Sequence, residues 1–181
     1  MVTNGYINPK PLDMILEFID AFNIDLKGFS DKFYKKFTGG KLSPVLNTLK
    51  TIAKSGKHLE ITYLVIPGLN DDETDFKKMA EWIASELGPS IPLHINRYYP
   101  AYKMTKESTP IETLLELREI ASQHLHHIFI GNVILGKGES NTRCENCGNE
   151  IVLRTQYSVK VVGVNNEGLC KNCGKAIPWK H

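Results

Sequence analysis

The first 134 residues alternate short apolar runs with segments in which apolar residues recur every three or four positions. Runs rich in β-branched residues predict strands, and the wider spacing predicts amphipathic helices. The expected strands lie near residues 2–7, 22–27, 58–66, 91–98 and 127–134. The expected helices lie between them, around residues 12–19, 45–53, 76–83 and 114–121. This alternation predicts parallel strands with helical crossovers and two buried sheet faces, in either an open sheet or part of a barrel.

Local signals indicate where two of these helices begin. Ser43 followed by Pro44 is typical of an N-cap and the first helical residue. The alternative caps for the next helix are Asn70, Asp71 and Asp72. Gly39 and Gly40 precede the first of these helices without the rest of a phosphate-binding motif, so we interpret them as a plain loop.

Polar residues stand where the predicted strands end, and the carboxyl ends of parallel strands carry the chemistry of α/β sheets and β/α barrels. These residues are Thr3, Asn4, Asp25, Lys27, Arg97 and Tyr99. In "NIDLKG", alternation places Ile24 and Leu26 on one face and Asp25 and Lys27 on the other. A charged pair on a buried strand is costly to desolvate. The segment is therefore either the mouth of a polar site or an edge strand with a solvated face.

Composition and charge exclude several classes of partner. With 41% hydrophobic and 23% charged residues, the chain is typical of a soluble globular protein with one core and a small appendix. The net charge of +2 favours neither nucleic acid nor anionic membrane. The sequence contains neither a membrane-spanning apolar run nor a signal-peptide pattern, so we expect no membrane partner and a cytoplasmic location.

The tail contains the most specific local motif of the sequence. Cys144 and Cys147 form one CxxC pair, Cys170 and Cys173 form a second, and a glycine follows each pair. Two such turns complete a tetrahedral S₄ site for zinc, or for iron in a rubredoxin-like site. The β-rich segment 151–164 between them predicts a hairpin. Closed S₄ coordination leaves no position for water, so the metal would be structural.

Histidines elsewhere in the chain are interpreted as structural. His124, His126 and His127 lie between a predicted helix and a predicted strand, without further metal ligands nearby in sequence. His94 alternates with apolar neighbours in the fourth predicted strand, so a hydrogen bond inside the sheet or barrel is expected of it.

The order of TNG, DLK and IPGLND, followed by a strand that ends in Tyr98 and Tyr99, resembles the second half of radical S-adenosylmethionine (SAM) enzymes similar to pyruvate formate-lyase-activating enzyme. The segments "HLEITYLVIPGLNDDE", "IPLHINRYYPAYKM" and "IFIGNV", with the CxxCG tail, are similar to the radical enzyme of the AmmeMemoRadiSam system. The resemblance covers nearly the whole chain. It implies an α/β fold with a partial (β/α) barrel over residues 1–134, and a linker with a small zinc-ribbon or rubredoxin-like tail over residues 135–181.

The resemblance also implies residues of a SAM site. The matching positions are Asn4, Asp25, Lys27, Thr62, Arg97 and Tyr99. Activating enzymes often have an acid where Val2 stands, an arginine at Thr62 and a histidine at Tyr99, so these three positions depart from the family's pattern. Arg97 would supply a cation for the carboxylate of SAM.

Members of this family bind a [4Fe–4S] cluster through a CxxxCxxC motif, which this sequence does not contain. The resemblance therefore implies a C-terminal portion of an enzyme that cleaves SAM reductively to a 5′-deoxyadenosyl radical, which abstracts hydrogen from a substrate such as a protein. The chain alone is not expected to turn over. We expect a homodimer or a complex with a separate N-terminal half, with Val2, Thr3 and Tyr6 near the contact.

A second hypothesis is a non-catalytic binding module, in which the α/β part is a scaffold for the metal ribbon. Residues 143–181 contain six Lys or Arg and three Glu, and a zinc ion with four thiolates subtracts two charges. The remaining charge of about +1 is too small to predict nucleic-acid binding.

Overall fold

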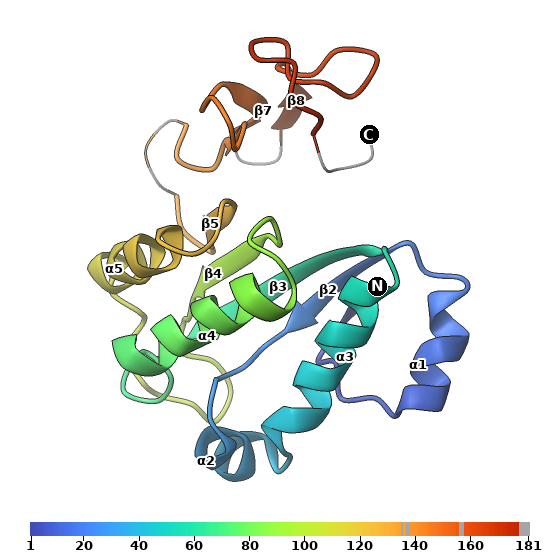
Figure 1. The fold of residues 1–181 in the computed structure, drawn as a ribbon. Helices are drawn as coiled ribbons and strands as arrows, with labels where there is room; N and C mark the ends of the chain where they lie inside the picture. The colour runs from blue at the N-terminus through green and yellow to red at the C-terminus, as the bar shows by residue number, and fades with distance from the viewer. Residues whose placement is uncertain (135, 137, 156–157, 178–181) are drawn as a thin grey trace. The chain divides into compact units, whose positions relative to one another are not determined.

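The computed structural model describes residues 1–134, 136, 138–155 and 158–177. The chain divides into two compact units, residues 1–132 and residues 133–181 (Figure 1). The described residues include no helix with both the length and the apolarity needed to cross a bilayer.

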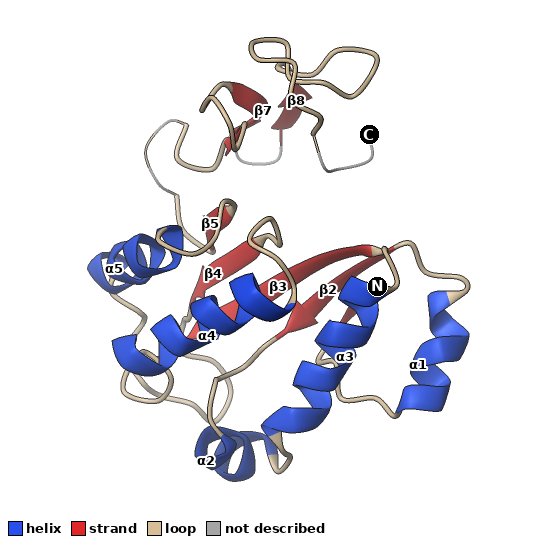
Figure 2. Cartoon of the chain, in the orientation of Figure 1, coloured by secondary structure: helices blue, strands red, loops and turns tan. Residues whose placement is uncertain are grey.

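The first unit is a five-stranded parallel sheet with the strands in sequence order (Figure 2). The strands are β1 (Val2–Thr3), β2 (Ala21–Asp25), β3 (His58–Val65), β4 (Leu93–Arg97) and β5 (Ile128–Gly131). All five predicted strands are confirmed. Sequential order in an all-parallel sheet is the order of a β/α barrel wall, whereas doubly wound sheets reverse direction at a switch point.

Helices connect the strands. They are α1 (Pro9–Leu16), α2 (Asp31–Phe33), the π-helix η1 (Tyr34–Thr38), α3 (Leu42–Lys54), α4 (Glu73–Glu86) and α5 (Ile111–Ser122). Four of them follow the predicted helical spacing. The α2–η1 segment between β2 and α3 was not predicted.

The two faces of the sheet differ in burial. Ile24, Ile61 and Ile95 face the helices and are fully buried, whereas their strand neighbours Asn23 and Thr62 are half-buried on the opposite face. Figure 1 shows α3 and α4 lying along the sheet. Among the described residues the prediction that both faces would be buried is therefore wrong, because β2 and β3 alternate apolar and polar residues, and the face with the polar residues, here called the polar sheet face, is only half-buried.

The two predicted helix starts have different outcomes. Asp72 is the N-cap of α4 and accepts a hydrogen bond from the backbone N–H of Asp75 at 2.9 Å, as one of the alternatives predicted. The prediction for Ser43 is wrong, since α3 begins at Leu42 with Lys41 as N-cap. Asp31 accepts a hydrogen bond from the N–H of Leu42 at 3.1 Å, and this non-local bond satisfies the first turn in place of a cap.

The second unit is a three-stranded antiparallel sheet of β6 (Thr142–Arg143), β7 (Glu150–Thr155) and β8 (Ser158–Val161). Strands β7 and β8 form the predicted hairpin, whose connecting residues 156–157 lie outside the described part of the chain. The buried apolar cluster of this unit contains Cys144, Ile151, Val152, Val164 and Cys170. Two of the four cysteines are thus part of its small core.

Candidate functional site

A pocket of about 310 Å³ opens at the carboxyl ends of β1 and β2. Its lining residues are Asn4, Tyr6, Asp25, Lys27, Tyr34, Thr38, Gly39, Gly40 and Val45. The structure therefore brings together three of the six residues that the resemblance implies for SAM, namely Asn4, Asp25 and Lys27.

Asp25 and Lys27 form an ion pair at the mouth of this pocket, with Nζ of Lys27 2.9 Å from Oδ2 of Asp25. Their side chains are 35% and 45% exposed, whereas Ile24 and Leu26 are fully buried. Strand β2 pairs with β1 on one side and β3 on the other. The alternative of an edge strand is therefore wrong, and the charged pair lies at a solvated pocket at the carboxyl end of an inner strand.

Gly5 fixes the turn that carries Asn4. Its φ is +69°, and a Cβ at this position would lie 2.8 Å from Cγ2 of Ile24, so a larger residue fits neither the backbone nor the space. Oδ1 of Asn4 accepts a hydrogen bond from the N–H of Tyr6 at 2.9 Å. The turn thus orients Asn4 beside the pocket.

Asn70 holds the segment that carries Lys27. Its amide nitrogen donates to the carbonyl oxygens of Lys27 and Leu64, both at 2.9 Å, and its Oδ1 accepts from the N–H of Ile66 at 2.7 Å. Asn70 was considered as a helix cap, but it is buried and instead ties the end of β2 to the end of β3. No local motif could have revealed these bonds, because Lys27 is 43 residues away.

The π-helix η1 and the two glycines that follow it form a wall of the pocket that the sequence did not predict. Gly39 ends this helix in the left-handed conformation, at φ 71°. Gly40 packs against the ring of Tyr6, since a Cβ on Gly40 would lie 2.9 Å from that ring. The interpretation of Gly39 and Gly40 as a plain loop therefore missed their position at the pocket. A π-helical turn is frequent at functional sites but has no simple sequence signature.

The other three predicted residues lie outside this pocket lining. Oγ1 of Thr62 donates to Oδ1 of Asn23 at 2.8 Å on the polar sheet face. Arg97 is the last residue of β4 and Tyr99 follows the strand, and the guanidinium carbon of Arg97 lies 4.9 Å from the centre of the Tyr99 ring. Nε of Arg97 donates to the carbonyl of Thr109 at 2.8 Å. Contact of Thr62, Arg97 and Tyr99 with SAM therefore stays a prediction.

The polar sheet face also carries a carboxylate between two histidines. Nε2 of His58 lies 3.0 Å from Oε1 of Glu60, and Nε2 of His94 lies 2.9 Å from Oε2 of the same carboxylate. These hydrogen bonds hold the pKa of Glu60 well below its usual range, and the bond to Glu60 raises the pKa of His58. The expected hydrogen bond of His94 is confirmed. Phe129 stacks on the His94 ring at 5.3 Å.

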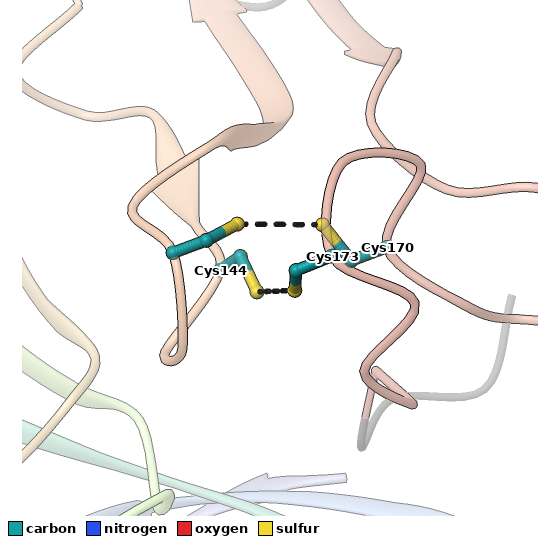
Figure 3. Close-up of side chains that lie close together, drawn as sticks. Cys144, Cys170 and Cys173 are labelled. Atoms are coloured by element: carbon teal, nitrogen blue, oxygen red, sulfur yellow. Dashed lines mark hydrogen bonds between the residues drawn. The ribbon is translucent and has the colours of Figure 1, made fainter.

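The four cysteines of the second unit converge on one point (Figure 3). The Sγ atoms of Cys144 and Cys173 lie 3.7 Å apart, and those of Cys147 and Cys170 lie 3.8 Å apart. All four Sγ atoms lie within 4.8 Å of one another. Around a tetrahedral zinc with Zn–S bonds of about 2.3 Å, sulfur atoms are about 3.8 Å apart. The spacing therefore fits an S₄ metal site, and a four-cysteine group of this kind could bind a metal.

The backbone around the four cysteines favours metal binding. Gly148 and Gly174, which follow the two CxxC turns, have φ angles of 69° and 73°. A hydrogen bond from the backbone N–H of Lys175, followed by one with the side chain of Asn146, lowers the pKa of the Cys173 thiol to about 6. Burial raises the pKa of Cys144 to about 11. Among the described residues this is the one group of three or more candidate ligands found together, so the histidines of "HLHH", between α5 and β5, are not part of such a group.

Comparison with known proteins gives the family context. Residues 1–83 match the sequence model of the Radical SAM superfamily. An uncharacterized protein of Methanocaldococcus jannaschii is 42% identical over 180 residues, which are 98% of this chain and 53% of the relative. Pyruvate formate-lyase 1-activating enzyme of Escherichia coli K12 is 28% identical over 82 residues, which are 44% of this chain and 33% of that enzyme. The chain thus spans about half the length of the first relative, and its match to the second spans about a third of that enzyme.

Among solved structures, a domain of pyruvate formate-lyase-activating enzyme from Bacteroides vulgatus superposes with a TM-score of 0.63 at 20% identity. The match covers 72% of this chain and 79% of that one. At this identity the similarity concerns the fold. The matches confirm the resemblance predicted from the sequence: residues 1–83 are similar to the Radical SAM superfamily, and the α/β unit has the fold of a domain of a pyruvate formate-lyase-activating enzyme.

Proposed function

We propose that residues 1–132 form the SAM-binding side of a radical SAM enzyme of the activating-enzyme type. The observation that carries the proposal is the convergence of Asn4, Asp25 and Lys27 on one pocket at the carboxyl ends of parallel strands. The methionine end of SAM carries a carboxylate and an ammonium group, which Lys27 and Asp25 complement in charge. Given one electron from a donor outside this chain, bound SAM would break its C5′–S bond to give methionine and a 5′-deoxyadenosyl radical that abstracts hydrogen.

The iron–sulfur cluster of the family does not fit the cysteines of this chain. All four cysteines belong to the S₄ group of the second unit, and none has CxxxCxxC spacing. We therefore derive no step through a cluster here. We propose that the cluster ligands come from another polypeptide segment and that this chain alone does not turn over.

For the second unit we propose one structural zinc or iron ion bound by Cys144, Cys147, Cys170 and Cys173. The sulfur spacing supports this site, and four thiolates leave no open coordination position for a substrate. Relatives that match 41% and 44% of this chain are named as activating enzymes of other enzymes, so we propose a protein as the substrate class.

Isothermal titration of the purified chain with SAM tests the binding proposal. The variant Lys27→Gln is expected to weaken SAM about tenfold or more, because it removes a charge-assisted hydrogen bond. Lys57→Gln is the matched control: Lys57 also pairs with an aspartate, Asp20 at 3.3 Å, but at the amino ends of β2 and β3. It should leave affinity unchanged.

Two results contradict the proposal. If the wild-type chain does not bind SAM, the α/β unit is better explained as the scaffold of a metal-ribbon binding module. If Lys27→Gln binds as tightly as wild type while both fold, SAM does not occupy the pocket at β1 and β2.

A further inference from the structure

We propose that Tyr34 is an additional ligand-binding residue, and that its hydroxyl group donates a hydrogen bond to the carboxylate of SAM beside Lys27. The inference rests on the proposed SAM site and adds a residue to it from the π-helix η1. Tyr34 lines the pocket together with Asp25 and Lys27, although it comes from a segment in which the sequence predicted no element.

The hydrogen bonds around Tyr34 leave one donor unused. Its hydroxyl oxygen accepts the backbone N–H of Lys27 at 3.3 Å. Among the residues that the structure describes, none accepts a hydrogen bond from the hydroxyl group itself. Tyr34 is 3% exposed, so water reaches it mainly through the pocket. A buried hydroxyl without an acceptor is unfavourable, and a ligand oxygen in the pocket would satisfy it.

Both the backbone and the ring of Tyr34 are held by neighbouring residues. The backbone carbonyl oxygen of Tyr34 accepts hydrogen bonds from the hydroxyl of Thr38 at 2.8 Å and from the N–H of Gly39. Phe33 packs against the ring edge-on at 6.2 Å between centroids. Ser30 caps the start of the segment by accepting from the N–H of Phe33 at 3.2 Å. The donor is therefore held in place before any ligand binds, which lowers the entropic cost of binding.

The charges around the pocket identify the ligand group. Lys27 supplies a cation, Tyr34 supplies a neutral donor, and both lie on the same stretch of wall. A donor and a cation together complement a carboxylate oxygen, whereas Asp25 beside them complements an ammonium group. Burial raises the pKa of Tyr34 to about 12, so the hydroxyl keeps its proton at every pH at which the chain would be studied.

The inference is tested by measuring how wild type and one variant each bind two ligands, as in a double-mutant cycle. The ligands are SAM and decarboxylated SAM, which lacks only the carboxylate, and affinities are measured by calorimetry. Tyr34→Phe removes the hydroxyl and keeps the ring, so we expect SAM to bind about tenfold more weakly and decarboxylated SAM to bind as it does to wild type. Tyr98→Phe is the matched control, since it removes a buried hydroxyl that donates to the carbonyl of Met104 at 2.8 Å. It should change neither affinity.

The possible outcomes distinguish a failure of the inference about Tyr34 from a failure of the proposed SAM site. If wild type binds SAM and Tyr34→Phe binds equally well, the inference about Tyr34 is wrong and the proposed site stands. If Tyr34→Phe weakens both ligands equally, the hydroxyl does not contact the carboxylate. If wild type does not bind SAM, the proposed function fails and the inference fails with it.

A measurement on the wild-type chain remains decisive even if Tyr34→Phe does not fold. With ¹³C at tyrosine Cζ, the signal of Tyr34 should shift when SAM is added and stay in place with decarboxylated SAM. An equal shift with both ligands, or with neither, contradicts the inference.

Discussion

Nε2 of His94 on β4 lies 2.9 Å from Oε2 of Glu60 on β3, on the polar sheet face. The other carboxylate oxygen receives His58, so one anion holds two imidazole rings. Asn23 lies beside them, with its amide nitrogen 3.4 Å from Oε2 of Glu60. The protonation states of Glu60 and His58 therefore make the stability of the fold depend on pH.

The contribution of Glu60 to stability should be largest between about pH 5 and 6.5. The pKa of Glu60 is lowered, so its contribution is present above the ordinary value of about 4.3 and is lost as pH falls. The pKa of His58 is raised, so its contribution is complete below about 6.5 and is lost as pH rises through the raised value. Glu60→Gln should cost about 1 kcal/mol of unfolding free energy at pH 5.5 and less at pH 8.5.

Urea unfolding followed by circular dichroism measures this difference. Glu86→Gln serves as the control, because Glu86 pairs with a lysine, Lys50, and not with a histidine. A cost of Glu60→Gln that is equal at the two pH values would contradict the charged pairing with histidine.

The ribbon should contain about one zinc or iron ion per chain, measured by elemental analysis of the purified protein. Ligation and folding are coupled in small sites of this type, so a chelator should unfold β6, β7 and β8 and leave the α/β unit folded. Amide exchange resolved by residue would distinguish the two units. Near-zero metal together with four thiols that react freely under native conditions would refute the S₄ assignment.

Replacing Asn70 should be among the most damaging single changes near the pocket. Asn70→Ala leaves the carbonyls of Lys27 and Leu64 and the N–H of Ile66 without the partner that the side chain provides. We expect a loss of about 2–4 kcal/mol in unfolding free energy. Asn47→Ala, at an exposed position of α3, is the control and should cost less than about 0.5 kcal/mol. Similar costs for the two variants would show that the Asn70 bonds contribute little.

Arg97 should contribute to stability through the loop that follows β4. Its guanidinium group donates to Thr109 and Tyr99, and Tyr99 in turn donates to the carbonyl of Asn132 at 2.9 Å. Arg97→Lys is expected to cost about 1–2 kcal/mol, because an ammonium group cannot make both bonds while stacking on the ring. Thermal unfolding measures the cost. Titration of the same variant with SAM shows whether Arg97 also contacts the ligand, in which case affinity falls as well.

The sequence predicted those elements that are determined by residues close together in the chain. Strand β2 is an example, since the alternation of Ile24 and Asp25 determines which residue is buried. The start of α3 could not be predicted in this way, because the carboxylate that accepts the N–H of Leu42 comes from Asp31. The same limit applies to the pocket: Asn4, Asp25 and Lys27 lie at or just after the ends of strands and were found, whereas Tyr34 reaches the pocket through a π-helical turn.

Burial on one side of the sheet has a consequence for how mutations are tolerated. In a library selected only for folding, β2, β3 and β4 should reject polar substitutions at every second position, such as Ile24, Ile61 and Ile95, and accept them at the positions between. A library selected for ligand binding should add intolerance at Asp25, where folding alone permits change. The difference between the two libraries would outline the functional surface of the strands without any knowledge of the substrate.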